Sequence, residues 1–406
     1  MTDTGHKADQ FDAGWALGQP DRIVDYGHRS IKATSDAARI FIQVYYGRAP
    51  RRRYFIGCSN GGRQALMAAQ HYPEDWDGIL AGAPAVQWTS QLATFAAIQN
   101  RLRQARKNWI AAAKLPAIQR AAVASCPPAS VSDGVPSDPQ LCRLDSRRLL
   151  CQAAQTSECL TPAEVDTLDL IRFGPRDVET GRHFYHGFEA ASADLPDNWE
   201  RWILNPDRDA QSQLTFATQA YRNLILERPR WHVEDLDLQR DLHLARNRAI
   251  AGKRLSEVLD ADDPDLTRFV AHGGKLILYF GWSDALLSPA AGLAYYRQVI
   301  ARMGGATKTQ RFARLFMVPG MQHCQGGSAP NSFGQAIVAP PLRPDERHDV
   351  RRALVAWVEK SRAPDVLVAA SYRTDRSGHL PTATRLLRPY PRTAGPVVPS
   401  AAEIGR

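Results

Sequence analysis

The stretch from residue 52 to residue 73, RRYFIGCSNGGRQALMAAQHYP, constrains the fold of this chain more than any other. An apolar strand, a glycine-rich turn and a helix that stops at Pro73 follow one another, and residues 57–61 match the pattern G-x-S-x-G. Such a turn exposes a serine hydroxyl above the edge of a parallel sheet. The stretch predicts a strand–turn–helix unit with Ser59 as the candidate nucleophile. A glycine-rich turn without chemistry is the alternative.

The segments around this unit alternate in the same way. Residues 28–47 have helical apolar spacing, residues 78–85 are a short apolar strand, and a strongly apolar strand returns at residues 273–282. Alternating helices and strands indicate a parallel sheet with helices on its faces. We therefore expect an α/β fold.

The region between these strands has a different character. It is longer, more polar and more irregular, so we predict a large insertion, called here the lid. The expected division is a catalytic core made of residues 1–87 and 271–388, a lid of residues 88–270, and a loosely ordered, proline-rich tail of residues 389–406.

A serine hydroxyl needs a base, and the base needs an acid that fixes its tautomer. His323 follows the apolar stretch RLFMVPG in a glycine-bounded loop, and Asp284 lies just past the strand at 273–282. The order Ser59, Asp284, His323 is the chain order of α/β-hydrolases. The backbone N–H of Asn60, at the start of the following helix, is the candidate oxyanion donor. Taken alone, Asp284 could equally be a helix cap.

Each candidate loop carries a cysteine, because Cys58 precedes Ser59 and Cys324 follows His323. If the serine and the histidine meet, these cysteines are neighbours and can form a disulfide. By chain entropy, closing so long a loop stabilises the fold by up to ~5 kcal/mol. We expect reductant to lower activity, because a loosely placed base costs rate.

The remaining composition excludes several classes of protein. The six cysteines contain no CxxC pair, which argues against a zinc or thioredoxin-type site, and their number and spacing suggest disulfides, with free buried thiols as the alternative. The net charge of +9 comes from scattered basic residues without a nucleic-acid-binding signature. No apolar run approaches the roughly 18 residues of a membrane span. We expect neither nucleic acid nor membrane as a partner.

Several stretches of the chain resemble the tannase and feruloyl esterase family of α/β-hydrolases. They are DTGH at 3–6, YGRAPRRRYFIGCSNGGRQALMAAQHYPEDWDGILAGAPA at 46–85, GGKLILYFGWSDALLSP at 273–289 and MVPGMQHCQGG at 317–327. The resemblance implies a serine esterase for small aromatic esters, with Ser59 as nucleophile, Asp284 as acid and His323 as base. It also implies a Cys58–Cys324 disulfide and a lid that sets substrate choice.

The resemblance extends to two short loops of the lid. It implies the disulfides Cys126–Cys142 and Cys151–Cys159, and within the first loop a structural calcium site. Of the expected calcium ligands the loop retains Asp133 and the backbone carbonyls of Val131 and Val135, while prolines and a serine replace the others. Calcium prefers several oxygen ligands, so an Asp-Gly turn without metal is the alternative. No cofactor is expected for the chemistry itself.

Relative to the family, the chain starts close to the DTGH motif, so N-terminal strands, a signal peptide and a second oxyanion donor are expected to be missing. The disulfides and the resemblance predict a secreted or periplasmic protein. A catalytically impaired remnant or binding protein of the same fold is the alternative function, and a serine peptidase is a weaker one.

Overall fold

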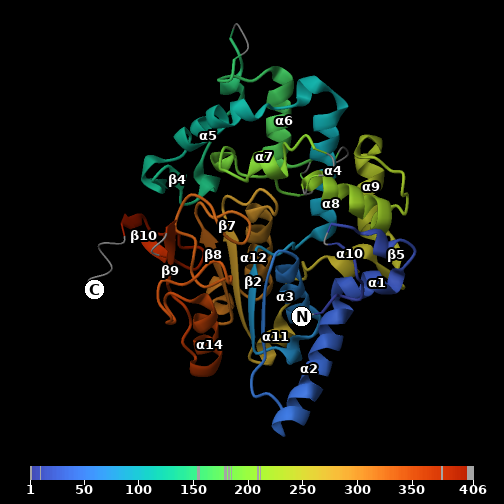
Figure 1. Ribbon diagram of the computed structural model, residues 1–406, viewed down its shortest axis with the longest axis vertical. Coiled ribbons are helices and arrows are strands. Elements are labelled where there is room, and N and C mark those ends of the chain that lie inside the picture. The colour runs from blue at the N-terminus through green and yellow to red at the C-terminus, as the bar shows by residue number, and fades with distance from the viewer. Residues whose placement is uncertain are drawn as a thin grey trace.

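The computed structural model of the chain describes residues 2–9, 11–152, 156–177, 181, 183, 185–207, 210, 212–375 and 378–399. Its centre is a parallel sheet of strand order β1–β2–β7–β8, formed by β1 (Tyr54–Cys58), β2 (Gly78–Gly82), β7 (Lys275–Gly281) and β8 (Ala313–Val318) (Figure 1). The predicted α/β-hydrolase architecture, a parallel sheet flanked by helices, is confirmed.

Both faces of the sheet are buried along β2, β7 and β8, as expected for parallel strands, whereas the edge strand β1 is only partly buried and its Ile56 is 47% exposed. Along β7, Leu276, Leu278 and Phe280 pack into one cluster with α3 and α12, while Ile277 and Tyr279 pack into another cluster with α14. The helices around the sheet are α1 (Pro20–Val24), α2 (Ser30–Tyr46), α3 (Asn60–His71), α11 (Thr267–Ala271), α12 (Pro289–Arg302), α13 (Ala306–Thr309) and α14 (Val350–Lys360). The alternation of faces explains why β7 has a continuous apolar sequence.

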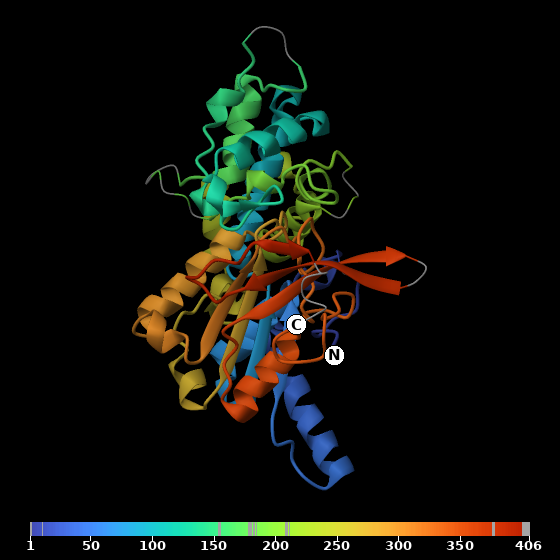
Figure 2. The ribbon, with the colours of Figure 1, turned by 90° about the vertical axis from the view of Figure 1, so that its left-hand side faces the viewer.

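The segment between β2 and α11 forms a helical layer above one end of the sheet (Figures 1 and 2). Its helices are α4 (Trp88–Gln104), α5 (Leu115–Ala124), α6 (Pro162–Phe173), α7 (Trp199–Trp202), α8 (Gln213–Ala220), α9 (Leu238–Asn247) and α10 (Leu255–Leu259). Two small hairpins accompany them, namely β3 (Val131–Ser132) with β4 (Val135–Pro136), and β5 (Ala249–Ile250) with β6 (Lys253–Arg254). Residues of this layer line a cavity together with Ser59, which directly follows the carboxyl end of β1. The layer therefore lies over the carboxyl ends of the strands.

The chain ends in a second, antiparallel sheet of order β11–β10–β9, with β9 (Leu367–Asp375), β10 (Gly378–Leu387) and β11 (Val397–Pro399). Its long hairpin projects from the body in Figure 2, whereas α2 extends away from the lid. The sequence predicts a loosely ordered tail from residue 389, but over residues 389–399 the chain is hydrogen-bonded to both sheets. Tyr390 N–H donates to Leu315 O, and Val397 and Val398 pair with β10. Residues 400–406 lie outside the described residues.

Candidate active site

The candidate nucleophile occupies a strained turn between β1 and α3. Ser59 has φ 62° and ψ −125°, a conformation that residues other than glycine adopt at an energetic cost. The backbone around it has no room for side chains, since a Cβ on Gly57 would lie 2.3 Å from Gly61 O and one on Gly62 2.2 Å from Gly82 O. At Gly61 itself a Cβ would meet open space. The glycines of this turn therefore permit close backbone approach at positions 57 and 62.

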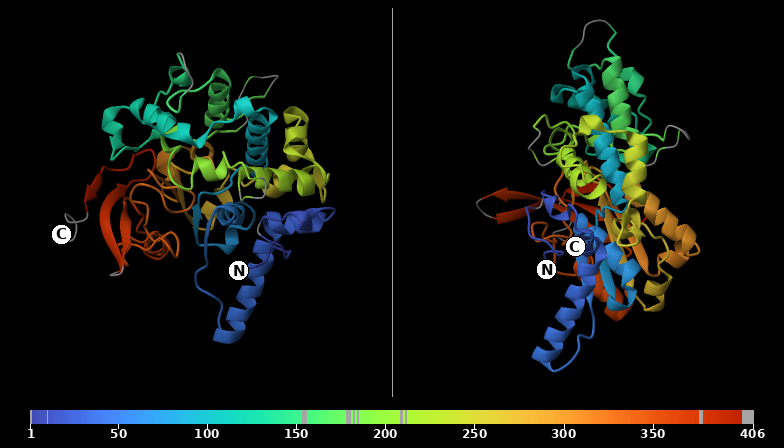
Figure 3. Two further views of the ribbon diagram at one scale, coloured as in Figure 1. Left: turned by 45° about the horizontal axis from the view of Figure 1, so that its top comes forward. Right: turned by 90° about the vertical axis from the view of Figure 1, so that its right-hand side faces the viewer.

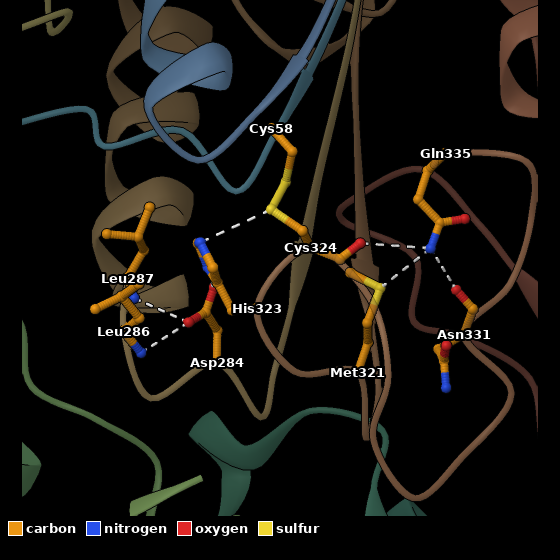
Figure 4. The surroundings of a disulfide bond; sticks show 9 residues. All are labelled: Cys58, Asp284, Leu286, Leu287, Met321, His323, Cys324, Asn331 and Gln335. Carbon is orange, nitrogen blue, oxygen red and sulfur yellow. Dashed lines mark hydrogen bonds and ion pairs between the residues drawn. A yellow bond between two sulfur atoms is a disulfide. The ribbon is translucent and has the colours of Figure 1, made fainter. Parts of the chain in front are cut away.

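The candidate acid and base meet at the ends of β7 and β8. Asp284 is 1% exposed, and its Oδ1 accepts hydrogen bonds from the backbone N–H groups of Leu286 and Leu287 at 2.8 and 2.9 Å. Its Oδ2 lies 2.8 Å from Nδ1 of His323. An ionised carboxylate only accepts hydrogen bonds, so Nδ1 donates and Nε2 is left to accept a proton. Figure 4 shows this pair beside the disulfide.

A disulfide between Cys58 and Cys324 joins the two halves of the site. His323 Nε2 lies 3.8 Å from Sγ of Cys324, so the imidazole faces the bond that leads to the Ser59 turn (Figure 4). In the described chain, no hydrogen bond joins Ser59 Oγ to the imidazole. Catalytic hydrogen bonds are often long before substrate binds. The structure thus forms the acid–base pair and connects it covalently to the residue before the nucleophile.

Gln335 supports the base loop, and sequence reasoning did not single it out. Its amide Nε2 donates to Asn331 O at 2.8 Å and lies 3.5 Å from the carbonyl oxygen of Cys324 (Figure 4). The side chain is 6% exposed. A lone glutamine in an irregular loop carries no sequence signal that separates it from a surface residue, so only the folded chain reveals this contact.

A cavity of about 150 Å³ opens beside Ser59 and Asn60. Its walls are mostly apolar and aromatic, and they come from the N-terminal segment, the lid and the Asp284 loop: Phe11, Trp15, Tyr26, Trp88, Leu92, Phe95, Phe216, Leu224, Leu286 and Leu287. Sequence reasoning assigned none of these residues to a pocket. The position of Trp88, soon after the end of β2, was a usable sequence signal for a residue near the site. Phe95 and Phe216 come together only through the packing of α4 and α8.

Asn60 begins α3, and its backbone N–H has no partner within the first turn, as at every helix start. The N-terminus of a helix favours negative charge. Asn60 also lines the cavity next to Ser59. The backbone N–H of Asn60 therefore lies beside Ser59 at a helix start, and its role as oxyanion donor stays a prediction.

The predicted calcium loop folds as a short hairpin closed by the Cys126–Cys142 disulfide. Asp133 and Gly134 form the two-residue connection between β3 and β4, with φ 51° and 73°. Two positive φ values with the sequence Asp-Gly are typical of a type I′ hairpin turn. Within the described residues no cluster of three or more His, Cys, Asp or Glu side chains could hold a metal ion. Asp133 with the carbonyls of Val131 and Val135 does not fit a calcium cage.

The third disulfide joins Cys151 and Cys159, so all six cysteines are paired. Among the described residues, no helix combines the length and apolarity that crossing a membrane requires. The two lid disulfides lie far along the chain from the candidate site.

The sheet, the sharp serine turn and the carboxylate–imidazole pair define an α/β-hydrolase. A family model described as tannase and feruloyl esterase matches residues 1–401, and the chain belongs to this family. It is accordingly a carboxylic ester hydrolase, and the comparisons do not favour a non-catalytic remnant.

Known relatives are esterases of both bacteria and fungi. An uncharacterized esterase of Xanthomonas campestris is 38% identical over 408 residues, which cover 97% of this chain and 71% of the relative. The mono(2-hydroxyethyl) terephthalate hydrolase of Piscinibacter sakaiensis is 29% identical over 443 residues, covering 97% and 70%. The crystal structure of feruloyl esterase B from Aspergillus oryzae has the same fold as this chain, with a TM-score of 0.85, 24% identity, and coverage of 96% of this chain and 75% of that chain. Figure 3 shows the fold of this chain from two further sides.

Proposed function

We propose that the chain is a serine carboxylesterase that cleaves esters of aromatic acids through an acyl-enzyme. His323 Nε2 accepts the Ser59 proton, Ser59 Oγ attacks the ester carbonyl carbon, and the Asn60 N–H stabilises the oxyanion. His323 then returns the proton to the leaving alcohol, and water releases the acid by the same route. The observation that carries the proposal is the Asp284–His323 hydrogen bond, held by the disulfide beside the Ser59 turn.

Asp284 supports this role through its surroundings. It is buried, and Leu286 and Leu287 hold its other oxygen, so the carboxylate stays oriented toward Nδ1. In this position it fixes the tautomer of His323 and stabilises the imidazolium that forms during proton transfer.

The walls of the cavity support an aromatic acyl group. Flat rings such as Trp88, Phe95 and Phe216 offer large apolar contact areas to another ring. A small phenolic acid such as ferulate has the matching shape and polarity.

The charges around the cavity favour a neutral acyl group over one with a free carboxylate. Among the described lining residues none is Lys or Arg, while Asp9 and Asp12 carry negative charge. Burial lowers the pKa of His6 below its ordinary value, so His6 adds no positive charge at neutral pH. A free carboxylate in this cavity would lose hydration without gaining a cationic partner.

The reaction is tested with a chromogenic aromatic ester. The wild type is expected to release the phenol in a burst followed by slower turnover, and Ser59→Ala to abolish both. Asp284→Asn is expected to lower kcat by about 10⁴-fold, because the wrong tautomer of His323 is then favoured. Unchanged turnover in Ser59→Ala would refute the proposal.

The preference for neutral acyl groups is tested with dimethyl and monomethyl terephthalate, which share the ring and differ in charge. We expect kcat/KM to be at least about tenfold higher for the diester, beyond the factor of two from its second ester group. Equal values would show that charge does not decide substrate choice here.

We also infer that the chain works in an oxidising compartment, outside the cytoplasm. Its three disulfides support this, because such bonds persist mainly outside the reducing cytoplasm. Non-reducing mass spectrometry of the native protein tests it, and free thiols at all six positions would contradict it.

A further inference from the structure

Arg63 stands three residues after Asn60 on α3 and is fully buried, at 0% exposure. Its Nε donates to Asn60 Oδ1 at 2.8 Å, and its Nη2 donates to Tyr26 O at 2.9 Å. Its Nη1 donates to Gly27 O and to Leu259 O, both at 3.1 Å. In the described part of the chain, no carboxylate accepts a hydrogen bond from this guanidinium.

A buried guanidinium without a hydrogen-bonded acid is costly and needs its donors satisfied. Here they are satisfied by oxygens of three separate segments. These are the short π-helical turn η2 (Asp25–Arg29), the start of α3 and the end of α10. An apolar side chain could fill the same space without this cost, but it could not hold the three segments in one arrangement.

The Asn60 side chain is the point where these contacts meet the candidate site. Its Oδ1 accepts from Arg63 Nε and also from the hydroxyl of Tyr26 at 3.3 Å. The Arg63 guanidinium lies over the Tyr26 ring at 4.8 Å. Asn60 is therefore held from two sides, while its backbone N–H lies beside Ser59.

The contact with Leu259 reaches the place where the chain passes between core and lid. Ala261 N–H donates to Val86 O at 2.7 Å, and Asp260 accepts from the N–H of Thr89, the second residue of α4, at 2.8 Å. The outgoing and returning connections of the lid are thus joined to each other, and Arg63 joins the returning one to the nucleophile helix.

We propose that Arg63 is a positioning residue that holds Asn60 as the oxyanion donor and ties it to the base of the lid. This inference rests on the proposed function, since it gives the Asn60 N–H a catalytic task. Arg63 does not touch the substrate. Its loss misplaces the donor by a fraction of an ångström to about 1 Å, and displacements of that size can cost up to about 10²-fold in rate.

The experiment compares Arg63→Ala with Arg314→Ala. Arg314 is a matched control, because it is also buried at 9% exposure and pairs with Asp365, but it lies at the amino end of β8, away from Ser59. Both variants lose a buried guanidinium, so both lose thermal stability. Only Arg63→Ala is expected to lose kcat, by about 10- to 100-fold, with KM changed less than about threefold.

Two further measurements separate positioning from a purely structural role. Guanidinium chloride at about 50 mM is expected to restore part of the kcat of Arg63→Ala and to leave the near wild-type kcat of Arg314→Ala unchanged. Tyr26→Phe is expected to lower kcat severalfold and to be non-additive with Asn60→Ala, since both remove the same contact. If Arg63→Ala does not fold, Asn60→Ala by itself keeps the test decisive, because it removes the acceptor of Arg63 Nε and keeps the backbone N–H: kcat is expected to fall by about tenfold, and a wild-type kcat would overturn the inference.

The inference is overturned if folded Arg63→Ala keeps the wild-type kcat, if its KM alone changes, or if Tyr26→Phe and Asn60→Ala are additive. These outcomes require an active wild type. A wild type that releases no phenol from any aromatic ester would instead refute the proposed function.

Discussion

Two disulfides of this chain close very different spans and act on very different surroundings. Cys58 and Cys324 are 266 residues apart, and their bond joins the turn after β1 to the loop after β8. Cys126 and Cys142 are 16 residues apart, and their bond closes one hairpin within the lid. The first aligns two halves of a site that local folding cannot bring together, whereas the second reinforces a turn that Asp133 and Gly134 already favour. The first bond therefore joins two segments of the candidate site directly, whereas the second acts within one hairpin, which reaches the loop after β8 through the packing of Val135 near Gly320.

The largest effect is expected from the double variant Cys58→Ala/Cys324→Ala. By chain entropy its free energy of unfolding falls by about 5 kcal/mol. The kcat of the folded fraction falls by about 10- to 100-fold, because the base loop is no longer fixed beside the Ser59 turn. Urea denaturation and single-substrate kinetics measure the two quantities. A wild-type kcat in the folded variant would mean that hydrogen bonds such as those of Gln335 suffice to place His323.

A smaller effect is expected from Cys126→Ala/Cys142→Ala. The shorter loop gives a loss of about 3 kcal/mol in the free energy of unfolding. Turnover by the folded fraction stays within about twofold of wild type, since no residue of the hairpin lines the Ser59 cavity and its contact with the loop after β8 does not depend on the bond alone. If kcat falls as far as in the first variant, the contrast between the two regions is wrong and the lid hairpin also positions the site.

The same contrast explains what the sequence could predict. The G-x-S-x-G turn, the apolar strand before Asp284 and the loop with His323 have local patterns, because each follows a buried strand whose sequence is continuous and apolar. The parallel sheet could be predicted for that reason. The cavity walls could not, because Phe95 and Phe216 lie on two lid helices whose packing depends on contacts more than 100 residues apart.

Arg63 shows a further limit of sequence reasoning. A positive charge in the first turn of a helix opposes the helix dipole, so the position of Arg63 in the first turn of α3 was a usable signal. Nothing in the sequence, however, identifies Tyr26, Gly27 and Leu259 as its partners, since they come from segments far from α3. The motif therefore predicts the turn but not the contacts that hold it.

Asp260 lies where the lid returns to the core and accepts hydrogen bonds from Thr89 of the outgoing lid connection, and its carboxyl gives a pH-dependent prediction. Burial raises the pKa of its carboxyl from the ordinary value of 3.8 to about 7, although Thr89 donates two hydrogen bonds to it. Between these values the folded chain binds a proton that the unfolded chain releases. The contribution of this group to stability therefore falls as pH rises toward 7, by at most about 1.4 kcal/mol per pH unit.

The variant Asp260→Asn removes this contribution while keeping an acceptor for the Thr89 N–H. We expect the difference in free energy of unfolding between variant and wild type to shift in favour of the variant from pH 5 to pH 7 and to level off above about pH 8. Denaturant titrations at each pH measure it. A difference that is constant over this range would mean that Asp260 is ionised in the folded chain throughout.

The smallest effect is expected from calcium, and it tests the lid hairpin directly. Asp133 is exposed and its backbone forms the Asp-Gly turn, and in the described chain no cluster of three or more His, Cys, Asp or Glu side chains could hold a metal ion. A cation held so weakly, with a dissociation constant above about 5 mM, stabilises the fold by less than about 0.4 kcal/mol at 5 mM calcium. The melting temperature should therefore differ by less than about 1 °C between 5 mM calcium and excess EGTA. A rise of several degrees with calcium that disappears in Asp133→Asn would show that the hairpin binds the ion after all, and that this disulfide, too, supports a site.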